Sequence, residues 1–239
     1  MKKNILLLSI LLFSFSATFS QQVVFEQDVN KDTIVPTKGP NLKNFSHLYF
    51  GFGLVLGSPD STGSDINMGS STDFIIGYRY KRKLSNFYAI GVDISYGATS
   101  FNLKQDSSKL LPSKELHDKE KINSNQLGLN LYNRFNFGKR GNHVGKFLDL
   151  GAYGHYTFNY KHIFKDQNEI ANSLHSSATK VVNTGLVYTN PLNYGVQARI
   201  GVNRYVLYGS YRLSDQFKAN YGFPELPRLI VGFQIGLHG

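Results

Sequence analysis

Eight stretches of this chain alternate apolar and polar residues with a period of two. Side chains of an extended strand point alternately to its two faces, so this period predicts strands whose faces meet different surroundings. An even number of strands is typical of an antiparallel sheet that closes into a barrel. The predicted strands cover residues 47–56, 73–81, 88–96, 126–137, 147–161, 192–202, 205–213 and 228–238.

The connections between these strands are alternately long and short, and the long ones all fall at one end. The long connections are 58–71, 101–124, 162–190 and 214–225, and the short ones are 83–86, 138–146 and 203–204. This asymmetry is typical of outer-membrane barrels, and a soluble sandwich gives no reason for it. The sequence therefore predicts an all-β, eight-stranded antiparallel up-and-down transmembrane β-barrel with short periplasmic turns and long extracellular loops. Residues 179–190 could form an extra hairpin or extend the flanking strands beyond the membrane.

The stretch "YAIGVDISY" (88–96) indicates which face of the sheet meets lipid. A soluble, lipocalin-like barrel would turn its apolar face inward. However, Tyr88 and Tyr96 stand about 26 Å apart on the apolar face, at about 3.3 Å per residue. This spacing matches an apolar band of about 25 Å bounded by aromatic girdles. We therefore expect the apolar face to meet lipid and the girdle to comprise Tyr88, Tyr96, Tyr156, Tyr160, Tyr205 and Tyr211.

The other face combines glycines with charged residues, as a narrow, side-chain-filled lumen requires. If residues 203 and 204 form a two-residue turn, the residue numbers of opposed positions on the two flanking strands add up to 407, which pairs Ile200 with Leu207. A sum of 283 similarly places Arg134 opposite Asp149. Buried charges must be paired or hydrated, so we expect an ionic network in the lumen. Its predicted members are Arg79, Asp93, Arg134, Asp149, Arg199, Arg212 and Arg228.

The first twenty residues have the layout of a secretory signal peptide. Lys2 and Lys3 precede an apolar run from Ile5 to Phe15, and cleavage is expected after Ser20. The run is short for the rival interpretation, a transmembrane anchor. We therefore expect a signal peptide (1–20), an irregular periplasmic tether (21–45) and the barrel (46–239). The chain contains no cysteine, so disulfides do not contribute to its stability.

Glycine-rich strands such as "FIIGYRY", "YAIGVDISYG" and "LIVGFQIGLHG" resemble those of the small outer-membrane barrels of Gram-negative bacteria. The chain looks like the OmpA/OmpX-like group, in the variant described as an outer membrane protein beta-barrel domain. The resemblance covers about residues 46–239 and implies an eight-stranded fold in the cell outer membrane. One departure is the C-terminus, where Leu237-His238-Gly239 replaces the terminal aromatic residue of many such barrels.

Catalytic and metal-binding signals are weak in this sequence. Lipid A deacylase-like barrels carry a His-x-Ser pair with an acid, and this chain has His175 and Ser177 with Glu169 upstream. Those residues fall in a long polar loop rather than on a strand, where a solvated histidine is the ordinary case. No histidine pair has metal-ligand spacing on a predicted element. We expect no catalytic, cofactor-binding or metal residues and no cofactor.

The expected function is that of a non-enzymatic outer-membrane barrel, acting through its surface loops or as a membrane anchor. One alternative is an accessory subunit of a secretion or gliding-motility complex, similar to PorT-like barrels. Another is a lipid A-modifying enzyme using His175 and Ser177. The expected partners are outer-membrane lipid and lipopolysaccharide, the barrel-assembly machinery, and proteins that bind the extracellular loops. Nucleic acid is not expected, because the net charge of +10 has no supporting fold or aromatic platform.

Overall fold

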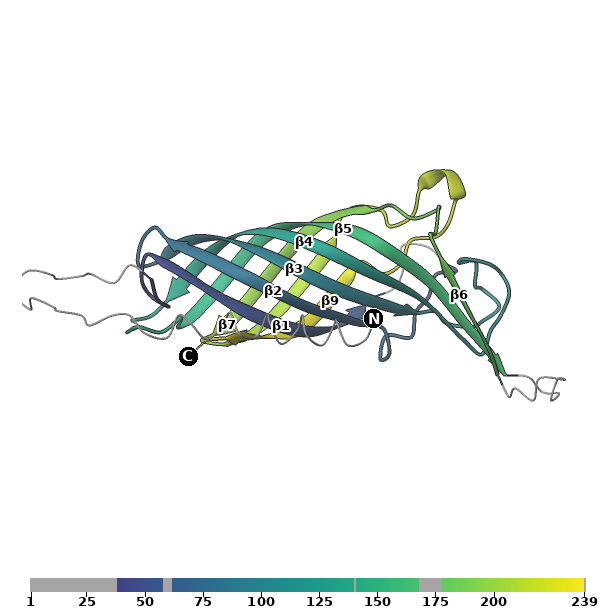
Figure 1. Ribbon diagram of the computed structural model, residues 1–239, viewed down its shortest axis with the longest axis horizontal. Coiled ribbons are helices and arrows are strands. Elements are labelled where there is room, and N and C mark those ends of the chain that lie inside the picture. The colour runs from purple at the N-terminus through teal and green to yellow at the C-terminus, as the bar shows by residue number, and fades with distance from the viewer. Residues whose placement is uncertain (1–37, 58–61, 140, 168–177, 239) are drawn as a thin grey trace, which may run out of the picture. The chain divides into compact units, whose positions relative to one another are not determined.

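Eight antiparallel strands close into a ring in the computed structural model, which describes residues 38–57, 62–139, 141–167 and 178–238. Pairing of the first strand with the last completes the ring, and Figure 1 shows the strands winding around the barrel at a tilt. The predicted eight-stranded barrel is confirmed. The strands of the ring are β1 (Asn44–Leu56), β2 (Thr72–Lys83), β3 (Tyr88–Asn102), β4 (Lys119–Phe137), β5 (Lys146–Gln167), β7 (Leu192–Val202), β8 (Tyr205–Arg212) and β9 (Leu229–Leu237).

The strand registers expected from the turns are also confirmed. In the β7–β8 hairpin Ile200 lies opposite Leu207 and Val196 opposite Tyr211. Asn203 has a φ of 54° in the connecting turn, the left-handed conformation that asparagine tolerates better than most residues. Arg134 on β4 lies opposite Asp149 on β5. Strand β1 begins at Asn44, two residues before the predicted start of the barrel.

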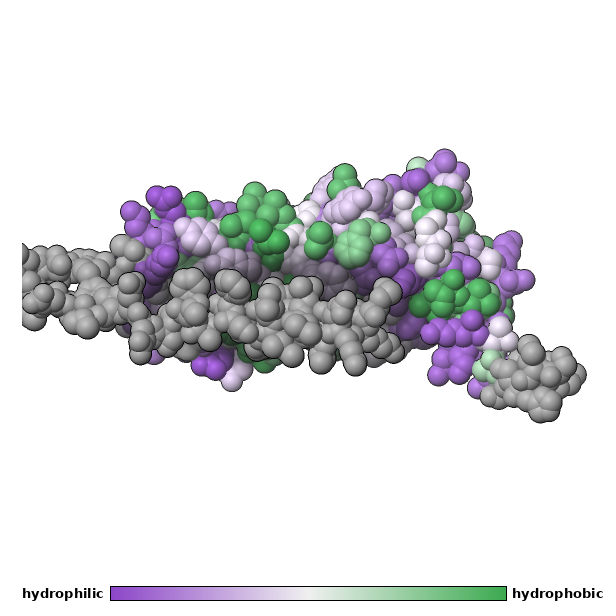
Figure 2. All heavy atoms as spheres, viewed as in Figure 1, coloured by the Kyte–Doolittle hydropathy of each residue, from purple (hydrophilic) through white to green (hydrophobic). Residues whose placement is uncertain are grey.

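The two faces of the wall differ in polarity as the alternation predicts. Leucine, isoleucine, phenylalanine and tyrosine are exposed on the outer face, for example Leu131 and Ile94. In the part of the wall that Figure 2 shows in colour, hydrophobic residues lie along it and hydrophilic residues gather toward its ends. Charged residues such as Arg79 and Asp149 are buried on the inner face. A wall of this kind suits lipid outside and packed side chains inside.

A β-bulge between β4 and β5 changes the faces of the residues beyond it. Gln126 pairs with Thr157, but Asn125 pairs with Asn159, so Phe158 is an extra residue on β5. Because one inserted residue reverses the alternation, Tyr160 turns inward and is buried. Its hydroxyl donates a hydrogen bond to the Asn190 carbonyl at 3.2 Å. The predicted place of Tyr160 in the outer aromatic girdle was therefore wrong.

The two ends of the barrel have different structures. At one end, which we call the turn end, connections are short and include Asn203-Arg204. At the other, the loop end, β4 and β5 continue beyond the rest of the ring, and β6 (Ala178–Thr184) pairs with β5 residues 161–167. The strands β5 and β6 project together from the barrel (Figure 1). Part of the 179–190 segment thus extends the sheet as an additional strand.

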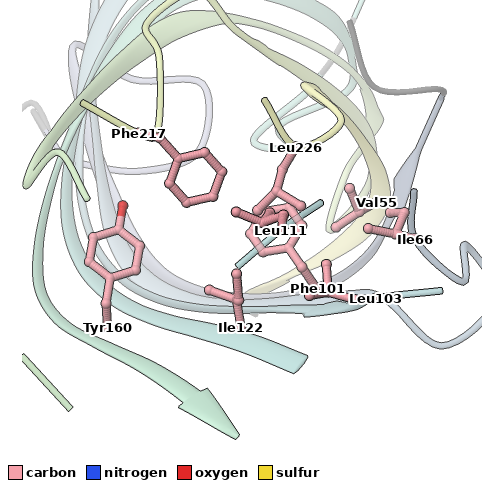
Figure 3. Packing of buried hydrophobic residues seen from close by; sticks show 9 residues of the cluster. All are labelled: Val55, Ile66, Phe101, Leu103, Leu111, Ile122, Tyr160, Phe217 and Leu226. Carbon is pink, nitrogen blue, oxygen red and sulfur yellow. The ribbon is translucent and has the colours of Figure 1, made fainter. Parts of the chain in front are cut away.

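The long connections fold over the barrel mouth and build an apolar cap. Figure 3 shows Phe217, Leu226 and Leu111 pointing into the space inside the wall, toward Ile122 and Tyr160. These side chains are buried and close the loop end with hydrophobic contacts. The cluster draws on three long connections and on strand ends, and Leu186 and Tyr188 from a fourth connection pack against it. Its buried members are Val55, Ile66, Phe101, Leu103, Leu111, Ile122, Tyr160, Phe217 and Leu226.

Candidate functional site in the barrel interior and at its loop end

Three arginines and two aspartates form one continuous chain of ion pairs inside the barrel. Arg79 contacts Asp93, with 3.0 Å between Nε and Oδ1. The other carboxylate oxygen of Asp93 accepts a hydrogen bond from Arg199. Arg199 Nε in turn lies 3.2 Å from Asp149 Oδ2. Arg134 donates two hydrogen bonds to the Asp149 carboxylate, of 2.7 and 2.8 Å.

The chain of ion pairs spans the barrel rather than running along one wall. Its members come from β2, β3, β7, β5 and β4 in contact order. Arg79 Nη2 extends the chain to β9 by donating to Gln234 Oε1 at 2.9 Å. Each charged side chain is only 1% exposed. Six of the eight strands are therefore held by one continuous set of ion pairs and charge-assisted hydrogen bonds.

Aromatic rings cover the arginines and accommodate the excess positive charge. Three guanidinium groups facing two carboxylates leave one net charge inside. The guanidinium carbon of Arg79 lies 4.2 Å from the Tyr49 ring centre, and that of Arg199 lies 4.5 Å from the Tyr132 ring centre. Arg134 is closer still, at 3.7 Å from the Phe147 ring centre. Desolvated contacts of this kind are attractive because the ring face carries negative potential.

Gly91 makes room for the central tyrosine of this layer. A Cβ atom at position 91 would overlap the Tyr132 ring and crowd the Tyr80 carbonyl. With glycine there, the Tyr132 hydroxyl donates to that carbonyl at 3.0 Å. The ring is thus fixed where Arg199 stacks on it.

Arg212 and Arg228 do not join this chain, contrary to the sequence prediction. Arg212 binds Glu225 at 2.9 Å and also donates to two backbone carbonyls at the base of the β8–β9 loop. Arg228 Nη2 contacts Asp215 at 2.7 Å nearer the surface. Both arginines anchor the loop end because it supplies acids and carbonyls within reach. The sequence pattern placed them on the inner face but could not give their height in the barrel.

Between the ionic chain and the apolar cap lies a small polar cavity of about 60 Å³. Asp73 borders it and accepts hydrogen bonds from Thr99 at 2.7 Å and Tyr208 at 3.1 Å. His155 also lines the cavity and stacks on Tyr153. A space of this size holds a few water molecules at most. The interior formed by the described residues is therefore filled and does not form a channel.

A second polar cluster surrounds Glu120 at the loop end. Glu120 lies beyond the apolar part of β4, because the outward residues beside it are lysine and asparagine rather than leucine. Its carboxylate contacts Lys109 and accepts a hydrogen bond from Gln105 at 2.8 Å. His162 Nε2 lies 2.6 Å from the other oxygen. Burial alone raises the pKa of Glu120, but the hydrogen bonds from His162, Lys109 and Gln105 outweigh it and lower the pKa below 4.5.

Five of the predicted girdle tyrosines do lie on the outer face. Tyr96, Tyr156, Tyr205 and Tyr211 are exposed there, and Tyr88 is partly exposed. The Tyr88 hydroxyl bonds Asn133 at 2.5 Å and that of Tyr96 bonds Asn125 at 3.3 Å. Both partners are outward polar residues on β4. These rings combine an apolar body with a hydrogen-bonding tip, as residues at a membrane interface do.

The catalytic candidates of the sequence, His175, Ser177 and Glu169, lie outside the described residues. Among the described histidines, His117 contacts Asp166 at 2.9 Å and stacks on Phe164. Within the described part of the chain, His, Asp and Glu form no group of three that could hold a metal ion. In the same part, no helix is long and apolar enough to cross a membrane.

Comparison with protein families identifies this architecture. The family model of the outer membrane protein beta-barrel domain matches residues 13–226, which is most of the chain. The chain belongs to this family. An outer-membrane barrel with a charged lumen and an apolar outer wall agrees with the geometry described above.

The similar proteins found by the other comparisons are distant. One solved structure is the attachment invasion locus protein Ail of Yersinia pestis, crystallised with the heparin analogue sucrose octasulfate. It is 14% identical, with a TM-score of 0.31, and the match covers 80% of this chain and 94% of Ail. No curated protein matches this chain significantly.

The sequence analysis did not predict several structural residues of this outer-membrane barrel. Gln234 and Tyr49 complete the ionic layer, and Glu225 anchors the last loop. Inward alternation on the first and last strands could have indicated Tyr49 and Gln234. The place of Glu225 depends on how its loop folds back.

We predict that Asp93→Asn destabilises the barrel by about 3–5 kcal/mol, because it leaves two buried arginines facing a neutral amide. Unfolding of the full chain in detergent micelles, followed by heat-modifiable gel migration against urea, measures the change. Asp106→Asn is the control, because Asp106 is exposed in a loop. Equal stability of Asp93→Asn and wild type would contradict a structural role for the ionic chain.

We predict that acid loosens the loop end through Glu120. A carboxyl whose folded pKa is depressed contributes stability above its unfolded value, here about 4.5, and this stability is lost as pH falls through the folded pKa. Hydrogen exchange of residues 103–118, corrected for its intrinsic pH dependence, should therefore accelerate below about pH 4.5. Glu120→Gln should flatten this response, whereas Glu115→Gln, an exposed side chain, should preserve it. An unchanged profile in Glu120→Gln would exclude this mechanism.

Proposed function

We propose that this chain is a non-enzymatic outer-membrane protein that acts through its loop end, as a surface interaction module or anchor. In this proposal the signal peptide is removed after Ser20, the turn end faces the periplasm and the loop end faces the exterior. The barrel holds the loops in place and conducts no solutes.

The observation that carries this proposal is that the interior is closed at two levels. The ionic chain fills the middle of the lumen, and the apolar cap covers the loop end. The space between them, about 60 Å³, is too small for a nutrient to pass. A small barrel filled by side chains offers its loops rather than a pore.

Exposed apolar residues at the loop end favour protein partners. The connections bury one side in the cap, yet they expose other large apolar side chains to the surroundings. Apolar side chains exposed on the loops offer surface that a protein partner can bury. This observation also supports the second candidate, an accessory subunit of a secretion or gliding-motility complex. The exposed residues are Met68, Leu110, Leu116, Val187 and Tyr221.

The proposal predicts that purified protein forms no steady channel in planar lipid bilayers. Phe217→Ser should loosen the cap but leave the bilayer non-conducting, because the ionic chain still closes the middle of the barrel. Current recordings over a range of salt concentrations provide the measurement. Stable conductance steps from the wild-type protein that grow with salt would contradict a filled lumen.

The proposed orientation is testable because the chain has no cysteine. A single cysteine at Lys114, in the exposed part of the 103–118 connection, should react with a membrane-impermeant maleimide on intact cells. A single cysteine at Lys139, at the turn end, should react only after the outer membrane is permeabilised. Reversed labelling of these two variants would refute an exterior loop end.

A further inference from the structure

Five lysines gather on one face of the β4–β5–β6 projection. Lys119 on β4 lies directly opposite Lys165 on β5, and Lys165 lies directly opposite Lys180 on β6. Lys121 stands two residues further along β4 on the same face. Lys161, opposite Asn123, is four residues closer to the barrel than Lys165. We refer to these five residues as the lysine face.

The bulge at Phe158 creates this face. Before the bulge, outward residues on β5 have even numbers, such as Tyr156, and after it they have odd numbers. Lys161 and Lys165 therefore turn outward beside Lys119, whereas without the inserted residue they would point inward. Bulges often redirect side chains at functional positions.

The charges of the projection are separated between its two faces. The neighbouring acids Glu120 and Asp166 alternate to the opposite face, where they contact His162 and His117. Within the described residues, the five lysines have no ion-pair or hydrogen-bond partner. Cross-strand neighbours lie about 5 Å apart, and like charges placed directly opposite are destabilising. An anion bound outside the barrel would therefore stabilise this row of three lysines across three strands.

The surroundings of the lysines suit a phosphorylated sugar. Ile163 and Val182 lie opposite each other in the row of Lys121, between the rows of Lys165 and Lys161, and provide an apolar surface. Asn123 and Thr184 flank Lys161 in the adjoining row and offer hydrogen-bonding groups. Lysines beside aliphatic and hydrogen-bonding side chains suit a phosphate carried on a saccharide.

The lysine face lies just beyond the apolar band of the barrel wall. The lysine face continues the same outer surface that carries Leu127 and Tyr156 in the apolar band. Lys121 lies six residues beyond Leu127, about 20 Å along the strand at about 3.3 Å per residue. A tilted strand places this residue somewhat lower, in the headgroup layer next to the hydrocarbon.

We propose that the lysine face binds the phosphorylated saccharide headgroup of an outer-leaflet glycolipid. The ligand's acyl chains lie against the apolar wall below, and its phosphates bridge Lys119, Lys165 and Lys180. The inference rests on the proposed function only in placing the loop end outside.

Binding is tested on full-length protein in mild detergent, titrated with bis-phosphorylated lipid A and followed by native mass spectrometry. The triple variant K119Q/K165Q/K180Q should raise the apparent Kd at least about tenfold, since each lysine near an anionic surface contributes appreciably. The control triple K104Q/K114Q/K139Q removes the same charge from exposed positions elsewhere and should bind like wild type. Heat-modifiable migration verifies that both variants are folded.

Two further probes distinguish the source of the phosphate. Dephosphorylated lipid A should bind wild type as weakly as lipid A binds the first triple variant. Dextran sulfate, a soluble polyanion, should compete only weakly. Wild-type affinity in K119Q/K165Q/K180Q, or tighter lysine-dependent binding of dextran sulfate than of lipid A, would overturn the proposal. These measurements in detergent do not depend on the orientation of the protein in the membrane. A negative result would therefore contradict the lysine face as a binding site without contradicting the proposed orientation, which the cysteine-labelling experiment tests.

Discussion

Asp93 and Asp149 hold three arginines in a lumen that excludes bulk water, and burial makes these contacts decisive for the fold. A guanidinium left without its carboxylate there costs several kcal/mol. Because side chains alternate around these charges, a shift of one residue in a strand that carries one of them would move the charge into lipid and bring apolar residues into the lumen. The ionic chain includes residues of β2, β3, β4, β5 and β7 and reaches β9 through Gln234. It therefore selects a single register for most of the ring.

Packing around the ionic chain depends on pairing large residues with small ones. Tyr132 can lie across the lumen only because Gly91 faces it, and its ring then supports Arg199. Toward the loop end, the cavity beside Asp73 and then the apolar cap follow this layer. The interior thus changes from ionic to polar to apolar toward the loop end. The barrel is therefore closed by charged residues in the middle and by apolar residues at the loop end, without disulfides.

The sequence was sufficient to predict whatever depends on alternation and on turn length. The pairings of Ile200 with Leu207 and of Arg134 with Asp149 followed from counting residues across a turn. The place of Tyr160 was predicted wrongly, because a single inserted residue has no signature in an otherwise continuous run. The cap could not be predicted either: Leu111, Phe217 and Leu226 are isolated apolar residues in polar loops, and only the folded connections bring them together. The same limit applies to Arg228, because its partner, Asp215, lies in a loop whose fold the sequence does not reveal.

The bulge at Phe158 links the interior of the protein to its outer surface. On one side of β5 it turns Tyr160 inward, where the ring joins the cap and its hydroxyl holds the Asn190 carbonyl. On the other side it turns Lys161 and Lys165 outward, into line with the lysines of β4 and β6. Removing the extra residue would therefore expose a tyrosine and bury two cations at once. Because both consequences are unfavourable, the cap inside the barrel and the lysine face outside it depend on the same bulge.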